Sequence, residues 1–440
     1  MQQQSNNNLT LTTLVVSLGG LLFGFDMAVV SGILPFVQKQ FGLSSVQEGW
    51  FVSSALAGCI VGVIFASDIS DRLGRKKLLA LSALLFLVSA VGCTFLSSFS
   101  WLIAARILAG MAVGIASSVV PLYLSEIAPA NKRGRLVTFY QLAVTIGIFV
   151  AYGSNILLLK YAPAPSQHTT GTWVDFIYNM DVWRKMFGVG TLPAIMFLFG
   201  ILWIPESPRW LKQKADRSAI TAPEESGYRQ LFAPQYRRAL LIGILLPLFS
   251  QFSGINAIIY YGPTILHNAG ITLDNSLLSQ LFFGAANVFF TFFAIWKVDS
   301  LGRRPLYLWG TSGAMISLIF TGLCFYNGAT NGIYLLLCVL AFLAFFAFSI
   351  GPLKFVIAAE IFPDSIRAKA LSLSIMVMWV ADAIVGQLTP MLLHSIGTAQ
   401  TFWFFALFCL LAFITVYKLI PETKGQTLEQ IQNNWKNIMH

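Results

Sequence analysis

Long apolar stretches recur along almost the whole chain, separated by short polar segments that carry most of the charges. Each stretch is close to or above the roughly 20 residues that an α-helix needs to cross a bilayer. Lipid offers the backbone no water, and the strands of a membrane barrel would be shorter and alternating, so we expect helices. The predicted spans are 10–36, 47–67, 78–96, 99–124, 136–158, 184–204, 238–266, 276–298, 305–327, 331–358, 369–393 and 400–420.

Composition and charge agree with a membrane protein. Of 440 residues, 56% are hydrophobic and 10% are charged, whereas a soluble domain carries about 25% charged residues. The net charge of +10 does not indicate a nucleic-acid partner, because Lys and Arg gather in alternate polar segments. The positive-inside rule then places these segments and both termini in the cytoplasm. The five cysteines lie inside apolar spans without metal-binding spacing, so we expect no metal ion.

The polar punctuation of the sequence repeats once, in the same order and at a nearly constant offset. Such a pattern predicts two six-helix repeats, and parallel repeats of this kind build two-lobed transporters with a binding site near the membrane midplane. The predicted organisation is a lobe at 1–204, a cytoplasmic linker at 205–236, a lobe at 237–420 and a cytoplasmic tail at 421–440. The matched segments are 71–76 with 299–304, 126–129 with 360–363, and 205–208 with 421–424.

Several short motifs follow one another in a fixed order. They are Gly-Gly-Leu-Leu-Phe-Gly-Phe-Asp at 19–26, Asp-Arg-Leu-Gly-Arg at 71–75, Arg106 with Gly110 and Gly114, Pro-Leu-Tyr-Leu-Ser-Glu at 121–126, Pro-Glu-Ser-Pro-Arg-Trp at 205–210, Ser-Gly-Ile-Asn-Ala at 253–257, and Pro-Glu-Thr-Lys-Gly at 421–425. Together they resemble the sugar-porter branch of the major facilitator superfamily over nearly the whole chain. The resemblance implies an all-α membrane fold of twelve transmembrane helices. The sequence shows no nucleophile–base pair, so we expect a transporter and not an enzyme.

Asp26 and Arg106 are charges inside predicted spans of the first lobe. Intramembrane charges are costly and usually pair or serve a transport pathway. If Arg106 moves away from Asp26 when the lobes rock, the affinity of Asp26 for a proton changes, which would couple transport to a proton. The resemblance supports this role, because proton-driven sugar porters carry Asp at this position. The alternative is a static ion pair that orients two helices.

Lys354 and Asp382 are charges inside predicted spans of the second lobe, and both depart from the family pattern. An isolated Lys or Asp would be costly there, but the two together would neutralise each other. They are either a compensating structural pair or a contact to a charged or unusually polar substrate.

Four amides inside apolar runs are candidates for binding sugar hydroxyls, because an amide both donates and accepts hydrogen bonds. They are Gln141, Gln251, Asn256 and Asn287. The resemblance implies the same role for these amides. Ser250 stands where relatives commonly have a further Gln, and Gly254 would allow span 7 to unwind and direct its polar groups inward. Interhelical hydrogen bonding and ordinary aromatic packing are the alternatives. The predicted substrate-binding residues are Gln141, Ser250, Gln251, Asn256, Asn287, Phe355 and Trp379.

Charged residues of both signs recur at the predicted cytoplasmic ends of the helices. Salt bridges there are individually weak, but a network formed only while the inner mouth is shut would bias the equilibrium between transport states. The alternative is that the arginines only set the topology. The predicted gate residues are Arg75, Glu126, Arg133, Glu206, Arg209, Arg303, Glu360, Arg367 and Glu422.

These observations favour a symporter that imports a monosaccharide or polyol with a proton by alternating access. We expect it to act as a monomer in the plasma membrane, of the bacterial inner-membrane kind, with no cofactor besides the co-transported proton. A facilitative uniporter of the same fold is the first alternative. A nutrient sensor that does not transport is the second, and the short tail at 421–440 disfavours it.

Overall fold

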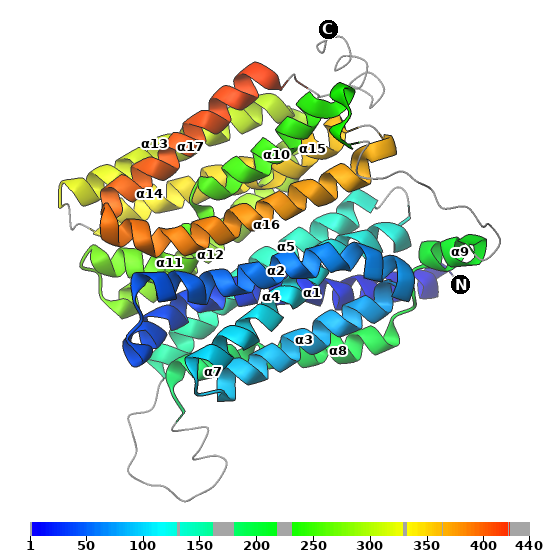
Figure 1. Cartoon of the computed structure of the whole chain (residues 1–440), viewed down its shortest axis with the longest axis horizontal. Helices are drawn as coiled ribbons and strands as arrows, with labels where there is room; N and C mark the ends of the chain where they lie inside the picture. The colour runs from blue at the N-terminus through cyan, green and yellow to red at the C-terminus, as the bar shows by residue number, and fades with distance from the viewer. Residues whose placement is uncertain are drawn as a thin grey trace, which may run out of the picture. The chain divides into compact units, whose positions relative to one another are not determined.

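The structure is a computed structural model that describes residues 2–129, 133–161, 180–217, 231–328, 332–362, 364–420 and 422. These residues form helices and no β-strand. Among them are twelve candidate membrane spans, long and apolar enough to cross a bilayer, at the places the sequence predicts (Figure 1). The chain is therefore an all-α, multi-pass membrane protein.

The helices follow one another with few interruptions. In chain order they are α1 (Gln2–Phe41), α2 (Ser45–Leu73), α3 (Arg75–Phe95), α4 (Phe99–Ile127), α5 (Arg133–Lys160), α7 (Val182–Val189), α8 (Thr191–Trp203), α9 (Pro208–Arg217), the 3₁₀ turn η2 (Pro234–Tyr236), α10 (Arg237–Phe252), α11 (Ile255–Asn268), α12 (Leu273–Leu301), α13 (Arg303–Tyr326), α14 (Gly332–Phe345), the π-helix η3 (Phe346–Ile350), α15 (Gly351–Ile361), α16 (Asp364–Ser395) and α17 (Thr398–Leu419).

Contacts divide the chain into two compact units, one of residues 1–220 and 259–284, the other of 221–258 and 285–440. In the first unit α1 packs against α5, and α3 packs against α8. In the second unit α10 packs against α16, and α13 packs against α17. The first span thus meets the fifth and the third meets the sixth in each repeat, as an internal duplication requires. The exact limits of the lobes and the linker at 205–236 stay a prediction.

Close packing of α2 on α4 depends on glycines that face each other. Gly58 and Gly62 lie on α2, and Gly110 and Gly114 lie on α4. A Cβ atom added to Gly110 would stand 1.7 Å from the carbonyl oxygen of Ala55, and one added to Gly58 would stand 2.2 Å from that of Ile107. Small residues four apart let membrane helices approach backbone to backbone, so each helix here supplies such a pair.

Three spans are not continuous α-helices. Span 7 is interrupted between α10 and α11 at Gly254, where φ is +86°, as the sequence led us to expect. Span 6 breaks at Gly190 between α7 and α8, and span 10 widens into a π-helix at Phe346–Ile350 just before Pro352. These two were not predicted. Irregular backbone inside a membrane is tolerated where protein surrounds it or it lines a cavity.

Candidate functional site

The two intramembrane charges of the first unit form an ion pair. Nη1 of Arg106 on α4 donates to both carboxylate oxygens of Asp26 on α1, at 2.9 and 3.0 Å. Arg106 is 1% exposed, and its guanidinium lies 6.0 Å from the ring centroid of Phe51 and 5.8 Å from that of Phe187. Its Nε has no hydrogen-bond partner among the described residues. Two aromatic rings therefore lie against the guanidinium side of the pair.

A small cavity of about 20 Å³ lies beside Asp26, bordered by Ser89 on α3 and by Phe187 on α7. A space of roughly 10–15 Å³, measured for water-sized probe centres, is enough for one water molecule. A carboxylate and a hydroxyl both line this space, so it suits one water molecule.

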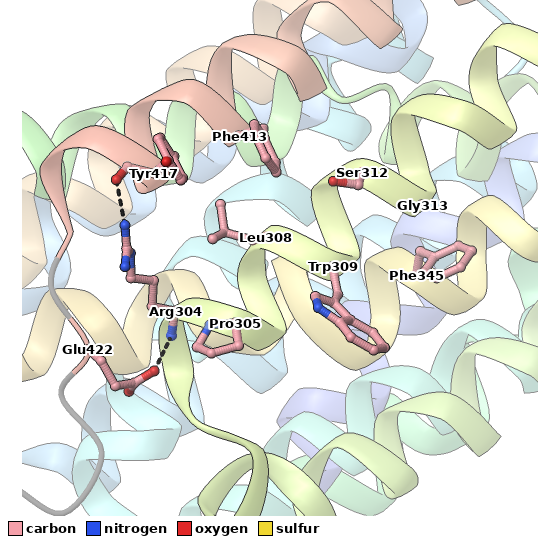
Figure 2. A pocket seen from close by; sticks show the side chains of 10 residues that line it. All are labelled: Arg304, Pro305, Leu308, Trp309, Ser312, Gly313, Phe345, Phe413, Tyr417 and Glu422. Atoms are coloured by element: carbon pink, nitrogen blue, oxygen red, sulfur yellow. Dashed lines mark hydrogen bonds between the residues drawn. The ribbon is translucent and has the colours of Figure 1, made fainter.

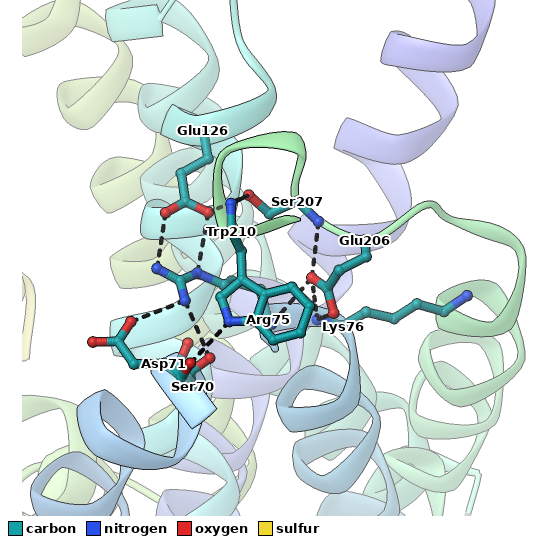
Figure 3. Close-up of polar contacts among 8 residues, drawn as sticks. All are labelled: Ser70, Asp71, Arg75, Lys76, Glu126, Glu206, Ser207 and Trp210. Carbon is teal, nitrogen blue, oxygen red and sulfur yellow. Dashed lines mark hydrogen bonds and ion pairs between the residues drawn. The ribbon is translucent and has the colours of Figure 1, made fainter. Parts of the chain in front are cut away.

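The turn between α2 and α3 holds a network of charged residues (Figure 3). Arg75 at the start of α3 makes two parallel hydrogen bonds to Glu126 on α4, from Nη2 to Oε1 at 3.0 Å and from Nε to Oε2 at 3.1 Å. Its Nη1 also donates to Asp71 at 2.9 Å. The Ser207 hydroxyl donates to Glu126 as well. Two parallel hydrogen bonds between an arginine and a carboxylate fix the relative orientation of both groups, which a single hydrogen bond does not.

Glu206 closes the same turn from the end of span 6. Its carboxylate accepts the backbone N–H groups of Arg75 and Lys76, each at 3.1 Å. These are free donors of the first turn of α3, where the helix dipole favours an anion. Gly74, which precedes them, has φ +101°, and a Cβ there would stand 2.3 Å from Glu206 Oε2. Glycine is therefore needed both for the backbone angle and for the space.

The second unit repeats this turn. Arg303 Nε donates to Glu360 Oε1 at 3.1 Å, and Glu422 accepts the backbone N–H groups of Arg303 and Arg304 at 3.1 and 3.2 Å. Gly302 has φ +90°, as Gly74 has its positive φ. Of the other predicted gate residues, Arg209 is exposed, and the side chains of Arg133 and Arg367 lie outside the described part.

The predicted sugar-binding residues are distributed over both units. Gln141 is exposed on α5 of the first unit. Gln251 lies in the last turn of α10 and Asn256 lies in the first turn of α11, so the break at Gly254 separates them. Asn287 on α12 is half-buried. The remaining members of the set have these positions: Ser250 is buried on α10, Trp379 is buried on α16, and the side chain of Phe355 lies outside the described part.

The charges of the second unit meet a predicted substrate contact. Lys354 Nζ on α15 donates to Ser250 Oγ on α10 at 3.0 Å. Asp382 on α16 is 2% exposed and interacts electrostatically with Lys354, which is 7% exposed. The structure therefore brings three elements together at one buried polar cluster. The described residues include no group of three or more His, Cys, Asp or Glu that would hold a metal ion.

Comparisons with known proteins agree with this arrangement. The family described as "Sugar (and other) transporter" matches residues 12–435. The chain belongs to the sugar-porter family of the major facilitator superfamily. It is 35% identical to the arabinose-proton symporter of Bacillus subtilis, over 97% of this chain and 94% of that protein. It is 34% identical to the D-xylose-proton symporter of Escherichia coli strain K12, over 96% and 95%.

Solved structures of xylose transporters are also similar to this chain. A crystal structure of a D-xylose-proton symporter superposes with a TM-score of 0.80 at 34% identity, covering 95% of this chain and 99% of that one. An inward-open structure of the xylose transporter of E. coli gives 0.80 at 33% identity, covering 97% and 100%. This sugar porter is accordingly a transporter and not an enzyme.

Two features of the candidate site were not predicted from the sequence. One is the capping role of Glu206 and Glu422, although the glycines at the helix starts were a usable signal because glycine has no side chain to cap a helix. The other is the hydrogen bond from Lys354 to Ser250. The sequence marks both residues as departures from the family pattern, but they are 104 residues apart, so the pattern does not indicate that they touch.

We predict that Lys354 and Asp382 depend on each other. Lys354→Met and Asp382→Asn should each lower the melting temperature of the purified transporter, because each leaves one buried charge uncompensated. The double variant should recover much of the loss, which a double-mutant cycle measures. Strict additivity would argue against pairing. A stable Lys354→Met protein that no longer binds substrate would instead assign Lys354 to the substrate, and Ser250→Ala is the matched control for loss of the hydroxyl alone.

We predict that Glu126→Gln shifts the sugar porter toward states that are open at the end of the helices where Arg75 and Glu126 lie. The variant keeps the shape of the side chain but removes the charge that holds Arg75. Distances between spin labels on the inner helix ends should lengthen in pulsed electron paramagnetic resonance. Asp181→Asn, which removes an exposed carboxylate near α7, is the control. Unchanged distances in Glu126→Gln would reduce the network to a topology signal.

Proposed function

We propose that this sugar porter imports a neutral monosaccharide or related polyol together with one proton by alternating access. The observation that carries the proposal is the buried pair of Asp26 and Arg106. Outside, a proton would join Asp26 and free it from Arg106 while sugar binds. After the lobes rock, Arg106 would return to Asp26 and expel the proton inward. No cofactor besides the proton is needed for this cycle.

The relatives support the coupling and the substrate class. Two of the proteins similar to this chain are an arabinose-proton symporter and a D-xylose-proton symporter. The amides Gln141, Gln251, Asn256 and Asn287 supply donors and acceptors suited to sugar hydroxyls. Ser250 and Lys354 change this set, so the identity of the sugar is left open. We propose the plasma membrane of a bacterium as the location, with both termini cytoplasmic and the monomer as the working unit.

A facilitative uniporter of the same fold is the second candidate. The geometry of the ion pair favours this candidate. Arg106 makes two hydrogen bonds to Asp26, and such a pair would also serve only to hold α1 against α4. The two candidates differ in one measurable property, which is whether a proton accompanies the sugar.

One experiment on purified protein tests both the substrate class and the coupling. Neutral monosaccharides and polyols are first screened by thermal shift, where a ligand at 100 times its Kd adds about 2.7 kcal/mol to the free energy of unfolding. The sugar that binds is then added to proteoliposomes while the pH of the external medium is recorded, with and without a protonophore. We expect the external medium to become alkaline as sugar enters. Uptake without a pH change supports the uniporter, and a shift only with amino acids or organic ions removes the sugar class.

A further inference from the structure

A groove of about 680 Å³ lies on the second unit between α13 and α17 (Figure 2). Leu308 and Trp309 of α13, Phe345 of α14 and Phe413 of α17 form its wall. Its volume falls in the range of about 300–1,000 Å³ typical of ligand sites. The predicted gate residue Glu422 lines it, but no predicted sugar-binding or proton-coupling residue does, so the groove is separate from the sugar and proton sites.

The groove opens on the surface of membrane-spanning helices. Trp309 is 73% exposed and Tyr417 is 60% exposed, and both lie on predicted spans. In a bilayer such side chains face lipid. Lipid tails are as apolar as leucine, so an apolar wall gives a tail a place to lie but does not by itself select one lipid over another. Selection has to come from a polar group at the end of the groove.

Arg304 stands at that end, at the start of α13. Its Nη2 donates to the carbonyl oxygen of Tyr417 at 2.7 Å, and its guanidinium lies 5.5 Å from the centre of the Tyr417 ring. Its buried Nε has no hydrogen-bond partner within the described part of the chain. Glu422 lies nearby, but its carboxylate accepts the N–H groups of Arg303 and Arg304. Lys418 adds a further positive charge in the last turn of α17.

We propose that this groove is a binding site for one anionic phospholipid, with an acyl chain along the apolar wall and the headgroup phosphate on Arg304. Arginine recognises phosphate through paired, charge-assisted hydrogen bonds. Basic pockets between transmembrane helices near the cytoplasmic side bind acidic headgroups in this way. The positive-inside rule places the Arg304 end of α13 at the cytoplasmic leaflet, where acidic lipids supply that charge. The site does not depend on which solute the transporter carries.

The internal repeat supplies a matched control. Lys76 occupies in the first unit the position that Arg304 occupies in the second. Its backbone N–H binds Glu206, and its Nζ donates to the carbonyl oxygen of Leu202 at 3.0 Å, as Arg304 does to that of Tyr417. Lys76→Gln therefore removes a charge from an equivalent helix end without touching the groove.

Native mass spectrometry of the full chain in mild detergent tests the proposal. The probes are phosphatidylglycerol and phosphatidylcholine with identical acyl chains. We expect one phosphatidylglycerol to remain bound where phosphatidylcholine is lost, and Arg304→Gln to lower its occupancy about fivefold, the effect of one basic group near acidic lipid. Lys76→Gln should retain it. Ser312→Trp, which fills the groove and keeps Arg304, should also lose the bound lipid.

Three outcomes would overturn the site. They are equal retention of the two lipids, unchanged occupancy in Arg304→Gln, and equal losses in Arg304→Gln and Lys76→Gln. Thermal melting of each variant without added lipid shows that the fold is intact. If Ser312→Trp fails to fold, the comparison of Arg304→Gln with Lys76→Gln still decides the question, because both are substitutions at helix ends.

Discussion

Asp26→Asn is expected to abolish uphill accumulation of sugar while leaving exchange intact. The amide mimics the protonated carboxyl but cannot release a proton, so the loaded carrier turns in both directions and net coupling is lost. At one proton per sugar, each unit of pH gradient is worth about 1.4 kcal/mol, or tenfold accumulation. The wild type should therefore approach tenfold accumulation per pH unit, and the variant should fall to equilibration. Radiolabelled uptake in proteoliposomes measures both.

Controls separate coupling from damage. Exchange of internal for external sugar should persist in Asp26→Asn and become insensitive to pH. Asp181→Asn, which changes an exposed carboxylate that pairs with Arg184, should keep full accumulation. Replacing Arg106 should shift the pH optimum of uptake if the proposed coupling holds, because Arg106 is the ion-pair partner of Asp26. Full proton-driven accumulation in Asp26→Asn would show that Asp26 does not couple the proton.

Gly110→Leu is expected to have the largest effect on stability. Even a methyl group at this position would overlap the carbonyl oxygen of Ala55, and backbone cannot move aside as a flexible side chain does. Overpacking a well-packed interior costs about 1–3 kcal/mol, and a backbone clash lies at or above the top of that range. The variant should lose much of its folded yield and melt at a clearly lower temperature, as measured by fluorescence-detected size-exclusion chromatography.

Gly153→Ala is a control at a glycine of the same unit that has room for a side chain. Gly153 lies on α5, and the nearest atom to an added Cβ would be Leu281 Cδ1 at 3.7 Å, which is ordinary van der Waals contact. Its melting temperature should stay near that of the wild type. If Gly110→Leu melts as the wild type does, α2 and α4 do not need backbone contact, and the glycine pairs are not the basis of their packing.

Sequence reasoning reached the fold because membrane spans are set by local hydropathy and length. It also located the break at Gly254, since glycine in a polar motif is a local signal. The π-helix at Phe346–Ile350 could not be predicted from the sequence, because it depends on how Pro352 and its neighbours pack against other helices. The break at Gly190 was missed for a different reason. Glycine is common inside membrane helices, so a glycine there does not by itself indicate a break.

The candidate site was predicted less completely than the fold. Asp26 and Arg106 could be paired because two opposite charges in one apolar lobe have few other partners. The Lys354 contact to Ser250 could not be foreseen, since Asp382 was the more obvious partner for a lysine. Which groups meet in a membrane interior depends on helix rotation, and the periodicity of a helix that is apolar on all sides does not specify that rotation.

The carboxylates of Glu206 and Glu422 also bear on how the protein is made. Glu206 completes the start of α3 from 131 residues further along the chain, and Glu422 completes the start of α13 from 119 residues further along. During synthesis the first of these contacts forms only after span 6 has emerged, and the second only after span 12. Each lobe is therefore completed by the segment that directly follows its last span. Since domains generally fold in the order of translation, the first lobe can be finished while the ribosome is still producing the second.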